Sequence, residues 1–557
     1  KTQQIHLIHS LFLLHPLFCA LNQIVLFNMF RLAIAFCFLA SASADFISKS
    51  IGSNMVLQRN KVSSVYGFVE ASNVTVNCTL DTVDYYAEVS EYGSAEGTFF
   101  WKCEFPEFPG GFDEYTIDIV SSSGERAMIE NVVFGDVFMC GGQSNMEFSM
   151  PGMSDADTEI PDADNFPYLR ILSVGEDTTS PFSEIPLDDL WSVEVPWSVG
   201  SAAVMQNAES DAFDYFSSVC YMTGKYIFTD LLDNGIPIGL ISSNWGGSII
   251  ETWMTSEGIS ACGDTPTANK PSSQFITNPA TVGDSYTSTP SVNFNNMIYP
   301  FKDMSFVAVL WYQGESNTGL NTDLYDCLQA NMMDAWRSMG SGWNDIPLLF
   351  VQLAPWAAGG TSAIADMRFT QYLATFHDTN SFMVSAADLG DPDSPYGDIH
   401  PRYKNEVGRR LSLAASTVLY GKPVPHSGPI VTSAGVLDDG SFGAYLLFDA
   451  DTIGPNGLHL SDAQTCPDPT VCGYHYLMYD SGAVLVDTDS MTIQDNKLIM
   501  YPSEPQTDVP TQVMYGYNDY PMLTIYNSYD LPLIPFVIPL PFSSNVFIKD
   551  LMKSRPH

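Results

Sequence analysis

The most chemically informative residue is a serine that follows two glycines, in the stretch Gly141-Gly142-Gln143-Ser144-Asn145. The apolar, β-branched run before it, at 132–140, predicts a buried strand that the glycines then end. Ser144 is therefore expected at the carboxyl edge of a parallel sheet, where open α/β folds place their ligand sites. A serine hydroxyl attacks a carbonyl only if a base takes its proton and N–H groups stabilise the oxyanion. By itself the stretch also fits a plain turn with a solvated serine.

The candidate for that base is His400, one of six histidines that follow residue 44. It lies in the loop Gly397-Asp398-Ile399-His400-Pro401, just before an amphipathic stretch at 405–415. From such a loop an imidazole can reach the sheet edge and act as a general base. Asp398 is the nearest carboxylate that could orient the ring, although residues two apart on an extended segment face opposite sides. The alternatives for this acid are Asp391 and Asp388.

Two further strand ends carry groups that could stabilise an oxyanion. The stretch Asn244-Trp245-Gly246-Gly247-Ser248 follows an apolar strand, and its glycines let backbone N–H groups approach a bound oxygen. The stretch Trp311-Tyr312-Gln313-Gly314-Glu315-Ser316-Asn317 ends another strand and supplies side-chain amides. Each stretch alone also fits a plain turn, so the indication of serine-dependent catalysis comes from their combination with Ser144 and His400.

Apolar strands and stretches of helical periodicity alternate between these motifs. Apolar residues recur at helical spacing in 219–232, 325–339 and 367–377. This alternation is typical of a parallel sheet covered by helices, so we expect an α/β fold here. The strands are predicted at 132–140, 169–174, 236–243, 305–312, 346–353 and 381–388.

Beyond its first 44 residues the chain divides into four predicted regions. Short alternating runs predict a small N-terminal β domain at 45–130 and a second β domain at 426–540. The α/β domain with the motifs above lies between them, at 131–425, and contains an insertion rich in Ser, Thr, Gly and Pro at 254–292. Residues 541–557 are expected to form an extended tail.

The first 44 residues predict a secretory leader. A short charged region begins at Met29, an apolar core covers 32–40, and small residues lead to a cleavage site near Ala44. Residues 1–28 are interpreted as upstream sequence, and a signal anchor is the alternative because 5–39 could span a bilayer. The protein is therefore expected in the secretory pathway, secreted or held in a lysosome- or vacuole-like compartment, with no membrane attachment after cleavage.

Eight cysteines remain after the leader, and an even count in a secreted chain favours disulfides over metal ligands. The sequence contains no Cys-x-x-Cys or His-Glu-x-x-His motif, so no metal site is predicted. Two Asn-x-Thr triplets make Asn73 and Asn77 candidates for N-glycosylation. The candidate disulfides pair Cys78 with Cys103 and Cys466 with Cys472.

The composition excludes partners that carry dense negative charge. The 557 residues include 64 Asp and Glu against 22 Lys and Arg, which gives a formal net charge of −42. Phosphate backbones and anionic membrane surfaces would be repelled, so nucleic-acid binding is not expected. A hydrophobic content of 45% excludes a mainly disordered chain, and the length requires more than one domain.

Together these motifs resemble the sialate O-acetylesterase family, and the resemblance extends over nearly all of 45–537 in the same order. The catalytic domain of that family is of the SGNH type, a serine esterase built on a flavodoxin-like parallel sheet. The stretches that carry the resemblance are 142–146, 244–247, 311–317 and 399–401, with Asn54-Met55-Val56-Leu57-Gln58-Arg59 near the start and 526–536 near the end.

The resemblance implies roles for four positions of this chain. Ser144 would be the nucleophile and His400 the base. The N–H groups of Ser144 and Gly247, with one side chain from the third motif, would form the oxyanion hole. Gln313 is the first choice for that side chain and Asn317 the second.

The chain departs from the pattern at the acid. SGNH esterases place an aspartate three residues before the histidine, and Gly397 stands there in this sequence. Asp398 is therefore only a first choice, and a dyad helped by Asp391 is the alternative. The implied reaction passes through an acetyl-serine intermediate and requires no cofactor or metal.

The expected substrate is an O-acetylated glycan or sugar, with sialic acid implied by the resemblance. Sialic acid is an anion, and a protein of such negative charge would need a local cation to bind it. The alternatives are an esterase for neutral polysaccharide of the acetylxylan kind, or a secreted carbohydrate-binding glycoprotein without activity. The sequence does not predict the oligomeric state. The candidate cations are Arg368, Lys404, Arg409 and Arg410.

Overall fold

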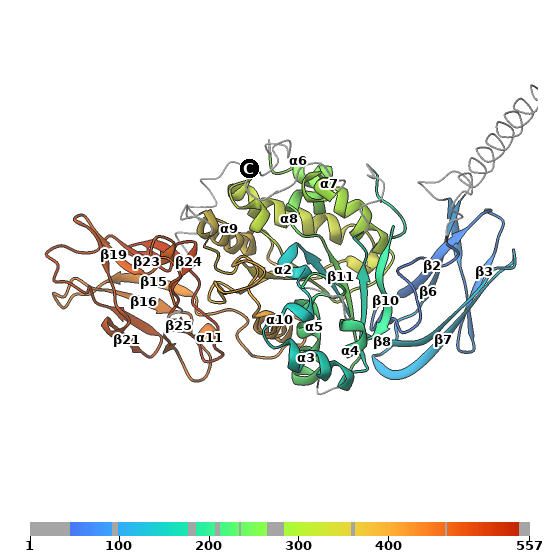
Figure 1. Cartoon of the computed structure of the whole chain (residues 1–557), viewed down its shortest axis with the longest axis horizontal. Coiled ribbons are helices and arrows are strands. Elements are labelled where there is room, and N and C mark those ends of the chain that lie inside the picture. Colours follow the sequence, from blue (N-terminus) through green and yellow to red (C-terminus); the bar gives the residue numbers. More distant parts are fainter. Residues whose placement is uncertain are drawn as a thin grey trace, which may run out of the picture.

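The computed structural model describes residues 45–91, 98–176, 185–206, 212–232, 235–263, 283–357, 363–462 and 465–544. An α/β body lies in the middle of the molecule, with an N-terminal β region at one end and a C-terminal β region at the other (Figure 1). The predicted leader at 1–44 and the last residues of the predicted tail, 545–557, lie outside the described residues. Within the described ranges, no helix is both long and apolar enough to cross a bilayer.

In the described part of the α/β body, six parallel strands and one antiparallel edge strand form the central sheet. The side chains of the six parallel strands, in β8 from Val132 onward, are buried almost throughout, because helices cover both faces. This explains the continuous apolar runs in the sequence. The strands, in their order across the sheet, are β10 (Val193–Val199), β9 (Leu169–Val174), β11 (Ile238–Asn244), β8 (Arg126–Gly142), β12 (Ala308–Tyr312), β13 (Leu348–Gln352) and β14 (Ser381–Ser385).

Two pairs of long helices flank this sheet (Figure 1). Helix α5 (Ser218–Tyr226) packs against α10 (Lys404–Val418), and helix α8 (Tyr325–Arg337) packs against α9 (Ala363–His377). The first pair approaches closely because Gly408 has no side chain; a Cβ there would lie 2.6 Å from Cβ of Met222. The shorter helices are α2 (Ser144–Glu147), α3 (Ala156–Asp162), α4 (Ala202–Met205), α6 (Ser256–Ser260), α7 (Gly283–Ser288) and α11 (Ala450–Ile453).

Strand β8 belongs to both the N-terminal β region and the central sheet. Its first part pairs with β7 in antiparallel fashion, and its last part pairs with β11 and β12 in parallel. One hydrophobic core accordingly runs from the N-terminal strands into the α/β body. The predicted start of the α/β domain, at 131, falls inside this strand. The other N-terminal strands are β1 (Val56–Gln58), β2 (Ser63–Val69), β3 (Val76–Leu80), β4 (Val83–Tyr86), β5 (Glu88–Glu91), β6 (Phe99–Phe105) and β7 (Gly111–Ser121).

The C-terminal β region has a core of its own and contains a five-stranded and a four-stranded antiparallel sheet. The last strand, Phe542–Ser543, pairs with Val431–Val436 and so continues the sheet into the segment predicted as a tail. The strands are β15 (Val431–Val436), β16 (Ala444–Phe448), β17 (His459–Leu460), β18 (Cys472–Gly473), β19 (His475–Tyr479), β20 (Gly482–Leu485), β21 (Met491–Gln494), β22 (Lys497–Met500), β23 (Gln512–Tyr515), β24 (Tyr520–Pro521), β25 (Ile525–Tyr526), β26 (Phe536–Pro539) and β27 (Phe542–Ser543).

Disulfides join all eight cysteines that follow residue 44. Both candidate pairs from the sequence are bonded, and the bond between Cys140 and Cys220 ties β8 to α5. Of the two glycosylation candidates, Asn73 is exposed, whereas Asn77 is half-buried and its amide donates to Asp84 at 3.1 Å. The pairs are Cys78–Cys103, Cys140–Cys220, Cys262–Cys327 and Cys466–Cys472.

Candidate active site

Ser144 lies at the carboxyl end of β8, at the start of the short helix α2. The chain can turn there because Gly142 adopts a φ of 148°, and a Cβ at this position would lie 2.2 Å from the Tyr312 carbonyl oxygen. Only glycine fits both conditions. The neighbouring Gly141 lies under the Trp311 ring, where a Cβ would be 3.2 Å from ring atoms. The two glycines therefore fix the turn that presents the Ser144 hydroxyl at the sheet edge.

The imidazole of His400 reaches the Ser144 hydroxyl, with 2.9 Å between Nε2 and Oγ. The other ring nitrogen, Nδ1, lies 2.8 Å from the carbonyl oxygen of Tyr396. A carbonyl only accepts, so Nδ1 carries the proton and Nε2 is left as the acceptor for the serine proton. Burial lowers the pKa of His400 most, and the positive charge of Lys404 lowers it further, while the Tyr396 carbonyl and Asp398 raise it.

Neither candidate acid contacts the His400 ring. Asp398 accepts a hydrogen bond from the Ala357 N–H at 3.0 Å, and Asp391 forms two hydrogen bonds with the guanidinium of Arg402, at 2.6 and 3.0 Å. The structure does not bring Asp398 to the ring, and its role as the orienting acid stays a prediction. The physical reason is the loop, which turns at Gly397 with a φ of 87° and brings a backbone carbonyl to Nδ1 instead.

Asp388, the third possible acid, is also occupied, because it forms a buried two-bonded ion pair with Arg410 at 2.6 and 2.8 Å. The loop that carries His400 is held by its own hydrogen bonds. The Ser394 hydroxyl donates to the His400 carbonyl at 2.7 Å, and the His400 N–H donates to the Gly397 carbonyl at 2.9 Å. The ring is thus positioned by backbone groups of a rigid loop.

The backbone N–H groups of Ser144 and Gly247 have no acceptor among the described residues. Gly247 is exposed and has a φ of 72°, which favours glycine. Its neighbour Gly246 lies against the serine, since a Cβ there would be 3.7 Å from Cβ of Ser144 and 2.7 Å from Oε2 of Glu147. Donors of this kind, on two adjacent strand ends, are what an oxyanion requires.

Gln313 and Asn317 do not present free amides to this position. The Gln313 amide donates to the Ser248 carbonyl at 3.0 Å and to Oδ1 of Asn317 at 2.8 Å, and the Asn317 amide donates to Glu251 at 3.0 Å. Both side chains are fully buried, at 0% exposure. In this structure their amides join the β11 and β12 loops, and the expectation that one of them completes the oxyanion hole stays a prediction.

The sequence did not predict a series of buried, hydrogen-bonded polar side chains next to Ser144 and His400. The Lys404 ammonium donates to Oδ1 of Asn145 at 2.5 Å, and the Asn145 amide donates to Glu315 at 2.5 Å and to the Ile399 carbonyl at 2.9 Å. Asn145 follows the serine and Ile399 precedes the histidine, so one amide joins both loops. Burial lowers the pKa of Lys404 to about 7 and raises that of Glu315. The adjacency of Asn145 to Ser144 was the available signal.

Gln143 was also missed, although it stands directly before the serine. Its side-chain oxygen accepts from the Gly314 N–H at 3.3 Å and the Ser316 N–H at 3.1 Å. The side chain is 2% exposed, and it thereby ties the β8 turn to the β12 loop. Within the described residues, no group of three or more His, Cys, Asp or Glu side chains could hold a metal ion.

The cations predicted to bind a substrate carboxylate are all engaged inside the protein. Lys404 and Arg368 are each 1% exposed, and Arg368 donates to four backbone carbonyls, with the shortest bond, at 2.7 Å, to Leu353. Arg409 forms two bonds of 2.7 Å with Glu406, and Arg410 pairs with Asp388. In this structure Arg368 and Lys404 are buried and hydrogen-bonded to neutral oxygen atoms, and a contact of either side chain with substrate stays a prediction.

Comparison with known proteins assigns the family. The sequence model for carbohydrate esterases described as sialic acid-specific acetylesterases matches residues 134–416. The sialate O-acetylesterase of Mus musculus is 32% identical over 428 residues, 70% of this chain and 77% of its own length. That of Homo sapiens is 33% identical over 398 residues, 68% and 72% of the two chains.

A solved structure is similar over most of the molecule. The crystal structure of a carbohydrate acetylesterase from Xanthomonas citri superposes with a TM-score of 0.69 at 26% identity. The match covers 88% of this chain and 99% of that chain, so it includes both flanking β regions. The chain therefore belongs to the sialic acid-specific acetylesterase family of carbohydrate esterases and is a carboxylic ester hydrolase, a carbohydrate acetylesterase.

Proposed function

We propose that the protein is a serine esterase that removes O-acetyl groups from sialic acid and related acetylated sugars. The observation that carries the proposal is the 2.9 Å contact between His400 Nε2 and Ser144 Oγ. The N–H groups of Ser144 and Gly247, which have no acceptor among the described residues, support it. Sugar O-acetyl esters are the substrate class that the names of the relatives indicate. An acetyl group is small, so sugar contacts would carry most of the recognition.

In the proposed reaction His400 Nε2 takes the Ser144 proton as Oγ attacks the acetyl carbonyl carbon. The N–H groups of Ser144 and Gly247 stabilise the oxyanion. The intermediate collapses to acetyl-serine, and the imidazolium returns its proton to the departing sugar oxygen. His400 then deprotonates a water molecule, which attacks the acetyl-serine; acetate leaves and the proton returns to Oγ.

The Tyr396 carbonyl takes over the orienting task of a triad acid in this proposal. It fixes the tautomer and the direction of the ring, but it carries only a partial negative charge. The imidazolium is therefore stabilised less than beside a carboxylate, and His400 stays neutral to lower pH. This agrees with the lowered pKa of His400, which burial causes first.

A second candidate substrate, a neutral acetylated polysaccharide, is favoured by one observation. The four cations that could have met the carboxylate of sialic acid are bonded within the protein, and the net charge is −42. An anionic sugar would gain no ion pair from them, whereas a neutral acetylated sugar needs none. Loss of catalysis is not favoured, because the hydroxyl and imidazole are within hydrogen-bonding distance.

We further propose an SGNH-type, flavodoxin-like catalytic domain at 131–425 between β domains at 45–130 and 426–540. The supporting observation is that β11, β8, β12, β13 and β14 follow the order 2-1-3-4-5 when numbered along the chain without β9, a further parallel strand that extends the sheet beside β11. We also propose a leader at 1–44, secretion, and glycosylation at Asn73. Four disulfides support an oxidising compartment, and the exposure of Asn73 supports its modification.

Acetate release tests the proposal. The native protein and Ser144→Ala are incubated with O-acetylated sialic acid, acetylated xylan and an aryl acetate. Turnover by the native protein and none by Ser144→Ala would support the serine mechanism, and the preferred glycan decides between the two substrates. A folded native protein that is inert on all three would refute the proposal and favour a carbohydrate-binding protein.

A further inference from the structure

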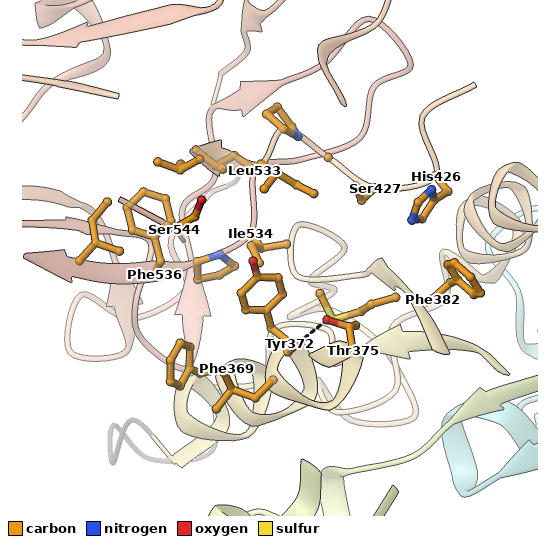
Figure 2. Close-up of a pocket in the computed structure, with 18 of the residues that line it drawn as sticks. Phe369, Tyr372, Thr375, Phe382, His426, Ser427, Leu533, Ile534, Phe536 and Ser544 are labelled. Atoms are coloured by element: carbon orange, nitrogen blue, oxygen red, sulfur yellow. Dashed lines mark hydrogen bonds between the residues drawn. The ribbon is translucent and has the colours of Figure 1, made fainter. Parts of the chain in front are cut away.

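A cavity of about 310 Å³ lies between the α/β body and the C-terminal β region (Figure 2). Helix α9 and the first residues of β14 form one side, and the segments 426–431 and 533–538 form the other. Ser144 lies at the carboxyl edge of the sheet, whereas β14 contributes Ser381, Phe382 and Met383 from its beginning. The cavity is therefore separate from the candidate active site.

The segments on the far side of the cavity are held close together by backbone packing. A Cβ at Gly428 would lie 1.7 Å from the Pro532 carbonyl oxygen, so the two segments meet at a position that only glycine allows. This side of the cavity is therefore formed by closely packed backbone.

Apolar side chains dominate the lining, and none of the described lining residues is Asp, Glu, Lys or Arg. A charged ligand would lose its hydration without gaining an ion pair, which makes its entry unfavourable. The large side chains that face the space include Phe369, Phe382, Leu533, Ile534 and Phe536.

Polar side chains interrupt this apolar lining: two rings, Tyr372 and His426, and the hydroxyl groups of Thr375, Thr379, Ser381, Ser427 and Ser544. Tyr372 extends from α9 toward Ile534 on the opposite side, and its hydroxyl has no hydrogen-bond partner among the described residues (Figure 2). Burial raises the pKa of Tyr372 to about 12, so the phenol keeps its proton and can donate. His426 lies at the other end with its ring edge toward Phe382, 5.6 Å between centroids, and burial lowers its pKa. Both groups are therefore neutral near pH 7.

We propose that this cavity binds an uncharged, mainly hydrocarbon molecule with one acceptor oxygen, to which the Tyr372 hydroxyl donates. The size fits, because a cavity of about 150 Å³ accommodates benzene and ligand pockets begin at about 300 Å³. The absence of charge in the described lining sets the class of ligand, and the Tyr372 hydroxyl supplies a hydrogen-bond donor for its acceptor oxygen.

The test uses Prodan, a neutral naphthalene dye with one ketone, whose emission shifts to the blue in apolar surroundings. The full-length protein is titrated with the dye, and the anionic dye anilinonaphthalene sulfonate is the comparison. We expect a saturable blue shift with Prodan and binding at least tenfold weaker for the anionic dye. Removal of the Tyr372 donor by Tyr372→Phe should weaken Prodan binding about threefold to tenfold.

A substitution that fills the cavity separates this site from others. Ile534→Trp places a larger side chain into the cavity and should abolish the Prodan shift. The control Val509→Trp, at a position that is 53% exposed and outside the lining, should preserve the shift. Acetate release and circular dichroism check that both variants fold. If Ile534→Trp does not fold, Tyr372→Phe, which keeps the shape of the site, still decides.

Prodan binding that is absent, or unchanged in both cavity variants, would overturn the proposal. Binding that appears only in a variant ending at Ser544 would also overturn it, because residues 545–557 of the same chain would then be the occupant. Ser544 is part of the lining, so this arm is a direct test of that competitor.

Discussion

Replacement of Asp398 by asparagine is expected to leave the rate of acetate release within about tenfold of the native rate. Asp398 accepts a hydrogen bond from the Ala357 N–H at 3.0 Å, and the asparagine carbonyl can accept the same bond. The ring of His400 is held by the Tyr396 carbonyl at 2.8 Å, a contact that the substitution leaves in place. Asp398 also raises the pKa of His400, so its loss should move the acid limb of the pH–rate profile to lower pH.

The magnitude decides between two geometries. A hydrogen bond contributes about 0.5–1.5 kcal/mol net, which is at most about tenfold in rate. Loss of the carboxylate from a serine-protease triad costs about 10⁴ in kcat. The assay is kcat for an aryl acetate, with Ser144→Ala as the baseline and thermal unfolding as the control for folding. A loss near 10⁴ in a variant with native Tm would refute the reasoning and assign Asp398 as the acid.

Two further substitutions test the surroundings of the serine. Lys404→Met removes a charge that lowers the pKa of His400, so the acid limb of the kcat/KM profile should move to higher pH. The control Lys422→Met, at an exposed position, should leave the acid limb in place. The same acid limb in both variants would contradict an effect of Lys404 on the His400 pKa. Gly142→Ala combines a positive φ with a backbone clash at 2.2 Å and should cost about 3–5 kcal/mol of unfolding free energy. Gly124→Ala has a positive φ of 108° in open space and should cost about 1–2 kcal/mol; similar losses of Tm in the two variants would contradict the clash.

The strands of the central sheet could be predicted because a strand that is covered on both faces has a continuous run of apolar residues in the sequence. The predicted strand at 169–174 coincides with β9. Strand β10 could not be predicted, because it is an antiparallel edge strand and contains Glu194 and Pro196. The early start of β8 was missed for a similar reason, since residues 126–131 alternate between exposed and buried positions as in the N-terminal sheet.

The contact between Ser144 and His400 could be predicted because Ser144 follows a strand and His400 precedes a helix, and these two ends meet at one edge of the sheet. The hydrogen-bond partner of His400 Nδ1 could not be predicted, because it depends on a left-handed turn at Gly397 that no residue pattern specifies. The burial of Arg368 could not be predicted either, because its hydrogen-bond acceptors include the carbonyls of Asn518 and Asp519, which lie about 150 residues later in the sequence. Long charged side chains are seldom buried, so exposure was the reasonable expectation.

Strand β8 is seventeen residues long and runs without interruption from the N-terminal sheet to the turn before Ser144. A shift in its pairing with β7 would therefore displace the backbone at Gly142 and the Ser144 hydroxyl that follows it. A different module in place of the N-terminal region would therefore have to pair with the same strand that leads to Ser144. The C-terminal region packs around a core of its own and shares no strand with the central sheet among the described residues.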